Sequence, residues 1–401
     1  MKAVGIAGTG TMGAGIAITF ARSGWDVLLH DVDRENVVRA FETISAEFHR
    51  DVEKDRIKPE DAQASVARIH PCTALADFAE VHLVVEAATE DLKVKQNLFA
   101  KLDELCGAEV PLTSNTSSLS ISAIGMSCAH RERIAGLHFF NPAHRMKLVE
   151  VVKTDFLSEE IAVELAQIVR QIGKTPVVAR DMPGFIVNRC ARQFYLEPLR
   201  FISERAGGIE EIDFAFESAN FSMGPFKLLD LVGLDTNLRV CKSIYDQFFY
   251  EPRFRPVVLQ QKMVEAGLLG RKSGGGFYSY DGKAPHPALK IDRRELFVNE
   301  SLREMARKIS GKLEIKNLLN DVQLLILART VSMIANEAYY MLEEGVATGE
   351  DIDLAMKLGM NFPRGPLELA DSVGKYLIAE FLQSMRRAYG GIYRPSLLMS
   401  N

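Results

Sequence analysis

A glycine-rich turn near the N-terminus constrains the fold of this chain more than any other feature of the sequence. Gly8, Gly10 and Gly13 follow a short apolar strand at 3–7 and open an apolar helix over 12–23. A Gly-x-Gly-x-x-Gly pattern between a strand and a helix is typical of a dinucleotide-binding α/β unit. The first glycine permits the tight turn, the second lets the backbone approach a pyrophosphate, and the third lets helix and strand pack closely. The pattern therefore predicts an N-terminal dinucleotide-binding domain.

Residues beside this turn complete the expected nucleotide site. The free N–H groups of the helix start, at Thr11, Met12 and Gly13, would face the phosphates. Asp31 ends the second apolar run, where a carboxylate can accept hydrogen bonds from both hydroxyls of the adenosine ribose. Because this carboxylate would repel a 2′-phosphate, the sequence favours NAD over NADP, although nearby Arg34 leaves NADP open. FAD binding and a purely structural glycine turn are the alternatives at this point.

Strands and helices alternate from the N-terminus to about residue 180. The clearest helix, at 158–172, begins with Ser158 as its N-cap and ends before Gly173. Strands alternating with helices predict a doubly wound α/β domain around a largely parallel sheet. The expected strands lie at 3–7, 25–30, 81–86, 111–114, 133–140, 148–153 and 175–179.

Beyond the turn at 181–184 the chain is helical, and it contains an internal repeat. The two copies are offset by 140 residues, which becomes 141 towards their ends. So many matches in one order are not readily explained by chance. The matched positions are Arg189 and Arg329, Glu197 and Glu337, Glu204 and Glu344, Ile212-Asp213 and Ile352-Asp353, Gly224-Pro225 and Gly365-Pro366, and Val232-Gly233 and Val373-Gly374.

These patterns divide the chain into four expected parts. Residues 1–183 form the nucleotide domain, and residues 184–280 form a first helical domain. Residues 281–315 are charged and polar, which predicts a solvated linker or an exposed helix. Residues 316–401 form the second helical copy.

Composition excludes several classes of function. The net charge is −5, with 47% hydrophobic and 25% charged residues, which gives no basis for binding nucleic acid or acidic membranes. No apolar run approaches the roughly 18 residues of a membrane span, and we find no secretory signal pattern. The 5 cysteines are scattered and form no metal-ligand pattern. We therefore expect reduced thiols, no metal and a cytoplasmic protein.

His138 stands out among the histidines as a candidate base. It lies in an apolar strand, and the next apolar strand carries Glu150. An unpaired carboxylate in a buried strand is costly, so we expect Glu150 to pair with the imidazole. A histidine whose other ring nitrogen contacts a carboxylate suits the removal of a hydroxyl proton. A hydrogen-bonded core histidine is the alternative.

Several motifs together resemble the 3-hydroxyacyl-CoA dehydrogenase family. The most specific is His138-Phe139-Phe140-Asn141-Pro142, followed by Leu148-Val149-Glu150-Val151-Val152. The resemblance covers essentially residues 1–280, and the second helical copy extends it to about 390. The other matching segments are 8–16, 114–119, 181–189, 222–226 and 272–278.

The resemblance implies a fold, a reaction and a cofactor. The fold is an α/β Rossmann domain followed by an all-α domain of the 6-phosphogluconate-dehydrogenase-like type, here in two copies. The reaction is the reversible oxidation of an (S)-3-hydroxyacyl-CoA to the 3-oxoacyl-CoA with NAD. Substrate would bind in the cleft between the domains.

The resemblance also implies roles for individual residues. His138 is the base and is oriented by Glu150. Ser117 hydrogen-bonds the substrate oxygen, and Asn188 helps to hold the thioester-bearing substrate.

Three further residues would lie at the cofactor. Asn115 approaches the nicotinamide ribose or carboxamide, and Glu90 and Lys95 flank the ribose. As alternatives, Ser117 and Asn115 cap the helix after their strand, and Glu90 and Lys95 are surface charges.

Each helical copy departs from the family pattern at one position. Leu196 precedes Glu197, where the family often has Asn, whereas the second copy has Asn336 before Glu337. The second copy has Ala328 in the place of Asn188, so we expect no active site there. Short family members pair through their helical domains. In this longer chain we expect an internal pseudo-dimer of the two copies, in a monomer or a homo-oligomer.

Two rival functions remain open from the sequence. One is dehydrogenation of a hydroxy acid that carries no CoA, which the His138 motif argues against. The other is a sensor that holds NAD without turnover, which the intact candidate site argues against. Acyl chain length and pathway direction are not determined by the sequence.

Overall fold

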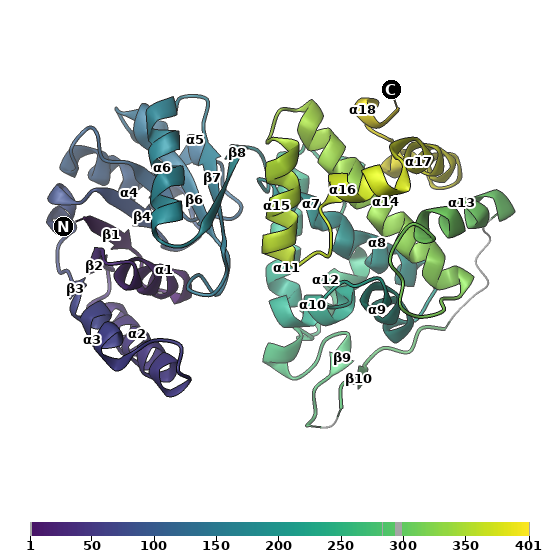
Figure 1. Cartoon of the computed structure of the whole chain (residues 1–401), viewed down its shortest axis with the longest axis horizontal. Coiled ribbons are helices and arrows are strands. Elements are labelled where there is room, and N and C mark those ends of the chain that lie inside the picture. The colour runs from purple at the N-terminus through teal and green to yellow at the C-terminus, as the bar shows by residue number, and fades with distance from the viewer. Residues whose placement is uncertain (1, 283, 293–298, 401) are drawn as a thin grey trace. The chain divides into compact units, whose positions relative to one another are not determined.

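The computed structural model describes residues 2–282, 284–292 and 299–400. The chain forms two compact units, Met1–Phe185 and Ile186–Asn401 (Figure 1). The division follows Phe185, whereas the sequence analysis placed a boundary after residue 183. The second unit contains both stretches that were expected to be helical copies.

The first unit is built on an eight-stranded sheet, in which β1 and β4 are neighbours and the strand order reverses. Ligands of doubly wound sheets bind at such a switch point. The strands are β1 (Ala3–Ala7), β2 (Asp26–His30), β3 (Ile69–Pro71), β4 (Leu83–Glu86), β5 (Leu112–Ser114), β6 (Ile134–Phe139), β7 (Leu148–Lys153) and β8 (Thr175–Arg180). Their order in the sheet is β3-β2-β1-β4-β5-β6-β7-β8. Neighbours from β3 to β6 are parallel, β6 and β7 are antiparallel, and β7 and β8 are parallel.

The expected strands are all present, and their ends differ from the prediction by at most two residues. Strand β3 was not predicted. It has three residues, contains Pro71 and lies at the edge of the sheet, so it has neither the length nor the apolar alternation of a recognisable strand.

Helices cover the sheet and bury its apolar side chains. Helix α1 is apolar on nearly every face and is buried from Gly13 to Ala21. At the start of α6 the Ser158 hydroxyl accepts a hydrogen bond from the Ile161 N–H at 3.2 Å, as an N-cap does. The helices are α1 (Thr11–Arg22), α2 (Arg34–Glu53), α3 (Pro59–Ala67), α4 (Leu92–Leu105), α5 (Ile121–Ile124) and α6 (Glu159–Gln171), with 3₁₀ turns at Leu75–Glu80, Gly125–Ser127 and Arg131–Arg133.

The second unit is helical apart from a short two-stranded pairing. Its long helix α14 is buried on nearly every face and packs against α8, α13 and α16 (Figure 1). The elements are α7 (Val187–Cys190), α8 (Arg192–Ser203), α9 (Ile209–Ser218), α10 (Pro225–Val232), α11 (Leu234–Gln247), α12 (Val258–Glu265), β9 (Tyr278–Ser279), β10 (His286–Pro287), α13 (Glu300–Ser310), α14 (Asp321–Glu343), α15 (Gly349–Met360), α16 (Pro366–Val373), α17 (Lys375–Tyr389) and α18 (Leu397–Ser400). Its 3₁₀ turns are Pro252–Phe254, Arg271–Ser273 and Gly391–Tyr393.

The interpretation of residues 281–315 as a solvated linker or exposed helix is wrong for α13. Residues 283 and 293–298 of this stretch lie outside the described residues. Helix α13 buries Leu302, Met305, Ala306 and Ile309 and packs on α14 and α17. The charged composition hid an apolar stripe at helical spacing, which needs a partner to cover it.

This packing predicts a large loss of stability when Ile309, which is fully buried, is shortened. The substitution Ile309→Ala should lower the free energy of unfolding by about 2–5 kcal/mol, because it leaves a cavity between α13 and its neighbours. Denaturant unfolding would measure the change. The exposed neighbour Ser301 supplies the control, since Ser301→Ala should stay within about 0.5 kcal/mol of wild type. Equal effects of the two substitutions would contradict the packing of α13.

Candidate active site

The glycine-rich loop has the shape that a bound dinucleotide requires. Gly8 has a φ of +107°, and a side chain there would clash with the backbone of Ala87. A Cβ at Gly13 would overlap the carbonyl oxygen of Gly8, so α1 approaches the loop as closely as it does because this residue is glycine. A Cβ at Gly10 would meet nothing within 4 Å. The loop is therefore closed on its inner side and open at Gly10, beside the start of α1.

Asp31 presents its carboxylate next to this loop. One oxygen accepts hydrogen bonds from the Thr9 N–H at 2.9 Å and the Thr9 hydroxyl at 3.0 Å. Burial alone would raise the pKa of Asp31, but these bonds and those from Asp33 and Asn36 outweigh it and hold the pKa below its ordinary value. An ionised acceptor beside an open phosphate loop fits the adenosine end of a dinucleotide. Arg34 is exposed at the start of α2.

A cavity of about 430 Å³ adjoins the open side of the loop. It is lined by residues 9–11 of the loop, by α2, and by residues 141–144 after β6. Arg39, Arg50 and Glu47 are the charged residues among those that line it, and Arg50 pairs with Glu47 at 2.5 Å. The cavity therefore extends the space beside the open face of the loop.

His138 and Glu150 lie directly opposite each other on the antiparallel strands β6 and β7. The imidazole Nδ1 is 2.6 Å from a Glu150 carboxylate oxygen, and both residues are buried. A carboxylate can only accept, so Nδ1–H donates, and in a neutral imidazole Nε2 then carries the lone pair. The rings of Phe140 and Phe185 flank the imidazole, with centroids 4.6 and 5.8 Å away. The arrangement is that of an oriented base with an acceptor Nε2.

The loop after β5 brings two further predicted residues to this end of the sheet. The Asn115 side-chain oxygen accepts the backbone N–H of Phe139 at 2.8 Å and so ties the loop to the end of the strand that carries His138. The half-buried Ser117 has no hydrogen-bond partner for its hydroxyl within the described part of the chain. The alternative of a capping role for Asn115 and Ser117 is wrong, because Ser120 is the residue that caps α5.

Glu90 holds the same loop from the other side. One oxygen accepts hydrogen bonds from the Thr116 hydroxyl at 2.6 Å, the Ser118 hydroxyl at 2.8 Å and the Ser117 N–H at 3.3 Å. Burial would raise the pKa of Glu90, but these bonds and the charge of Lys95 outweigh it and lower the pKa. Glu90 is therefore part of a network that fixes the position of Ser117.

The alternative that Lys95 is a surface charge is wrong. Its side chain is 1% exposed, and its ammonium lies 2.6 Å from Glu86 and 3.5 Å from Glu90. Because Lys95 is buried against Glu90, its side chain has almost no exposed surface that a ligand could contact. Glu86, fully buried at the end of β4, also accepts the Ser114 hydroxyl at 2.5 Å and the Ala88 N–H at 2.6 Å.

Glu86 is a site residue that the sequence analysis missed. A glutamate that ends a buried apolar strand needs a partner, and this requirement was the available signal. Lysine at position 95 is the partner, nine residues later on α4.

Asn188 is separate from these residues, because it belongs to the second unit. It lies in α7 and is half-buried. Its side-chain amide has no hydrogen-bond partner among the residues that the structure describes. Ala328, in the corresponding place of the second copy, is fully buried in α14.

Comparisons with known proteins agree with this geometry. Residues 3–182 match the family model described as "3-hydroxyacyl-CoA dehydrogenase, NAD binding domain". Residues 184–280 and 325–401 match "3-hydroxyacyl-CoA dehydrogenase, C-terminal domain".

Within the described ranges, no helix is both long and apolar enough to span a bilayer.

Similar proteins include relatives that match the whole of this chain and shorter ones that match about two thirds of it. The chain is 36% identical to 3-hydroxyadipyl-CoA dehydrogenase of Escherichia coli, over 100% of this chain and 97% of that one. It is 39% identical to a probable 3-hydroxybutyryl-CoA dehydrogenase of Deinococcus radiodurans, over 69% of this chain and 99% of the relative. The crystal structure of 3-hydroxybutyryl-CoA dehydrogenase from Escherichia coli has a TM-score of 0.87 and 35% identity, and the match covers 99% of this chain and 97% of that chain.

The loop geometry predicts different outcomes for two glycine substitutions. Gly13→Ala should lower both the unfolding midpoint and the affinity for NADH, because the methyl group overlaps the Gly8 carbonyl. Gly10→Ala should leave the unfolding midpoint close to wild type yet weaken NADH binding by about tenfold or more, because its methyl group occupies the open face of the loop. NADH fluorescence titration and thermal unfolding would separate the two effects. Wild-type NADH affinity in Gly10→Ala would contradict a phosphate site here.

Proposed function

Because this chain belongs to the 3-hydroxyacyl-CoA dehydrogenase family, we infer that it oxidises a 3-hydroxyacyl-CoA to the 3-oxoacyl-CoA with NAD. The observation that carries the chemistry is the buried His138–Glu150 pair, with Nδ1 on the carboxylate and Nε2 left as an acceptor. It lies in the unit that also has the open glycine loop and Asp31. The reaction is reversible, and it supports fatty-acid or related acyl-CoA metabolism.

His138 and Glu150 handle the proton of the reaction. The Nε2 lone pair takes the proton of the substrate hydroxyl, and Glu150 stabilises the imidazolium that forms. Bound NAD supplies the acceptor for the hydride that leaves the same carbon. In the reverse direction His138 returns the proton to the oxygen of the 3-oxo group. The buried carboxylate keeps the ring in one orientation throughout.

Other residues hold the substrate. Ser117, with its free hydroxyl, donates a hydrogen bond to the reacting oxygen. Asn188 donates to the substrate from the second unit and helps to position the thioester-bearing chain. The Glu90 network supports the placement of Ser117, since it binds the backbone and both neighbours of that residue.

The cofactor is held by the glycine loop and by the ends of the neighbouring strands. Gly8, Gly10 and Gly13 shape the loop, and the N–H groups of Thr11 and Met12 at the start of α1 face the pyrophosphate. Asp31 accepts the hydroxyls of the adenosine ribose, which excludes a 2′-phosphate and selects NAD.

Residues at the other end of the cofactor serve the nicotinamide half. Asn115 and Glu90 lie near the nicotinamide ribose. Lys95 acts there through Glu90, because its ammonium is enclosed by two carboxylates.

The free state of all five cysteines is in keeping with a cytoplasmic location.

We further propose that the two helical copies form a pseudo-dimer within one chain. Arg189 of the first copy binds Glu337 and Glu344 of the second, and Arg329 of the second binds Glu197 and Glu204 of the first. Reciprocal contacts of this kind are typical of a two-fold interface, in which residue i contacts j and j contacts i.

Corresponding turns within the two copies also share one design. Asp213 accepts the N–H groups of Phe226 and Lys227, and Asp353 accepts those of Leu367 and Glu368. These paired contacts, together with the two matches to one C-terminal family model, support a duplication.

The proposed mechanism predicts a severe defect for the base and for its partner. His138→Ala should lower kcat by about 10²- to 10⁴-fold, because no other group takes the proton. Glu150→Gln should lower kcat by about 10²-fold or more, since an amide neither stabilises the imidazolium nor enforces one tautomer. NADH affinity should be unchanged in both. The assay is NADH absorbance with acetoacetyl-CoA, followed by a panel that includes 3-hydroxybutyryl-CoA and 3-hydroxyadipyl-CoA.

A control histidine makes the result specific. His70 lies on the edge strand β3, its side chain is 53% exposed, and His70→Ala should retain full activity. Wild-type turnover in His138→Ala would contradict the mechanism. A wild-type protein that binds NADH but fails with every thioester in the panel would favour the sensor or the non-CoA hydroxy acid.

The pseudo-dimer predicts that breaking the reciprocal contacts destabilises the chain without dissociating it. Arg189→Ala should lower the free energy of unfolding by about 1.5–3 kcal/mol, because it removes charge-assisted hydrogen bonds to Glu337 and Glu344, while Glu337 keeps Arg253 as a partner. The sedimentation coefficient should not change, since both partners belong to one chain. Arg329→Ala should behave in the same way. A smaller species in either variant would show that these contacts join separate chains.

A further inference from the structure

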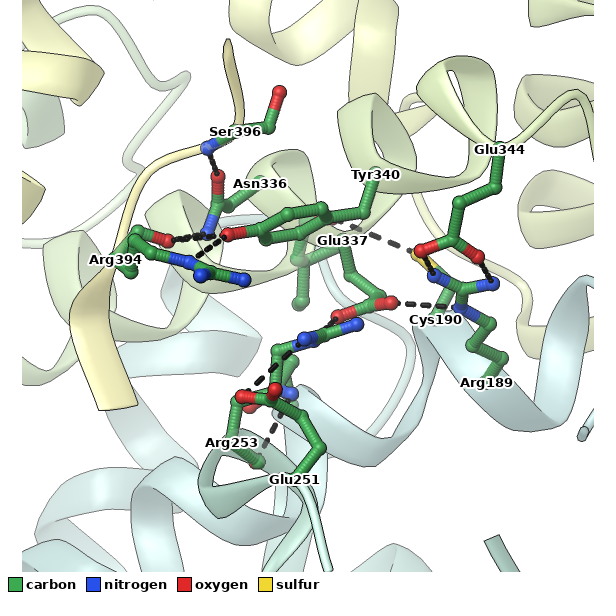
Figure 2. A network of polar contacts seen from close by, with 12 residues as sticks. Arg189, Cys190, Glu251, Arg253, Asn336, Glu337, Tyr340, Glu344, Arg394 and Ser396 are labelled. Atoms are coloured by element: carbon green, nitrogen blue, oxygen red, sulfur yellow. Dashed lines mark hydrogen bonds and ion pairs between the residues drawn. The ribbon is translucent and has the colours of Figure 1, made fainter. Parts of the chain in front are cut away.

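Asn188 is followed in the chain by Arg189, whose guanidinium hydrogen-bonds two glutamates of the second helical copy and lies over the ring of Phe248 in the first. The Arg189 side chain is fully buried in the second unit. Its Nε donates to Glu337 at 2.7 Å, and its two terminal nitrogens donate to the two oxygens of Glu344 at 2.7 and 3.1 Å (Figure 2). Each guanidinium edge therefore contacts a carboxylate of the opposite copy.

This arginine helps to hold α7, which also packs on α14 and α15 and leads after one residue into α8. The helix has only four residues, which is too short to be stable by itself. Besides Arg189, the Cys190 thiol contacts the Ile334 carbonyl of α14 at 3.6 Å. A buried guanidinium must keep its carboxylates, because an unpaired charge in the interior is very costly. Through Arg189, the second copy holds the backbone turn that presents the Asn188 side chain.

Glu337 is itself held firmly in place. It accepts a second bond, from Arg253 Nε at 2.8 Å, and Arg253 packs over the ring of Tyr340 (Figure 2). Burial would raise the pKa of Glu337, but the charges of Arg253 and Arg189 outweigh it and lower the pKa. Glu337 therefore stays ionised and keeps Arg189 in one position.

The chain contains the same contact a second time, without an asparagine before the arginine. Arg329 Nε donates to Glu197 at 3.2 Å, and its terminal nitrogens donate to Glu204 at 2.8 and 3.1 Å. Glu197 also has a second arginine partner, Arg200. The residue before Arg329 is Ala328, so this copy of the contact positions no polar side chain.

We propose that Glu337 and Glu344 of the second copy are positioning residues for Asn188, which they orient through Arg189. The inference rests on the substrate-binding role given to Asn188 in the proposed function. This inference gives the second copy a part in the reaction, even though the second copy has Ala328 in the place of Asn188. The reciprocal pair, Glu197 and Glu204 with Arg329, has a structural role only.

The two halves of this arrangement supply a matched pair of variants. Glu344 and Glu204 have side chains that are 32% and 29% exposed, and each binds its arginine through both oxygens. Glu344→Gln and Glu204→Gln should lower the unfolding midpoint by similar amounts. Only Glu344→Gln should lower kcat/KM for acetoacetyl-CoA, by about tenfold or more, because a small misplacement of a binding group is costly. NADH affinity should stay at the wild-type value in both.

A double-mutant cycle then tests whether the effect passes through Asn188. Asn188→Ala alone should lower kcat/KM, and adding Glu344→Gln should cost nothing further, since the group being positioned is gone. Equal kcat/KM for Glu344→Gln and Glu204→Gln, with Asn188→Ala impaired, would overturn the positioning role and leave the proposed function intact. An additive loss in the double variant would also overturn it. Full activity in Asn188→Ala would overturn the role proposed for Asn188 and this inference with it.

Discussion

A charge buried in a protein interior needs a partner of opposite sign, and in this chain that requirement connects the structural elements around the candidate site. The fully buried Glu86 joins the end of β4 to α4 through Lys95 and to the end of β5 through Ser114. Glu150 joins β7 to β6 through His138. In the second unit, Arg189 joins the two helical copies. Removing one member of such a pair would weaken the contact, so each pair helps to fix the position of the backbone that carries it.

The reversal of strand direction at β7 makes the pairing of His138 with Glu150 possible. Strands β1 to β6 follow the parallel rule of a doubly wound sheet, in which neighbours are separated by a crossover helix. Strand β7 instead runs back beside β6 after a short loop, so residues only twelve apart in sequence lie opposite each other. A parallel neighbour would have required a longer connection, and Glu150 would not have followed His138 so closely.

The proposed duplication of the helical domain would give the chain both halves of an interface. The arginine and the two glutamates are present in each copy, yet only one copy retains the asparagine beside its arginine. The second copy keeps both of its glutamates. Their presence is explained if the arginine of the first copy still needs them as partners. Their loss would leave Arg189 buried without a counter-charge, which constrains the second copy even though it has no site of its own.

The features that could be predicted from sequence are those set by neighbours along the chain. The glycine loop, the strands apart from β3, and the opposition of His138 and Glu150 follow from spacing, from apolar runs and from the cost of a buried carboxylate. The internal repeat was visible for the same reason. Other features depended on contacts between distant residues. Tertiary structure alone decided that Lys95 lies buried between Glu86 and Glu90, that Ser120 caps α5, and that α13 packs on α14. It also decided that Arg189 finds its carboxylates 148 and 155 residues away. Local periodicity shows which side chains must be buried or paired, but the identity of the partner is set only when the chain brings distant segments together.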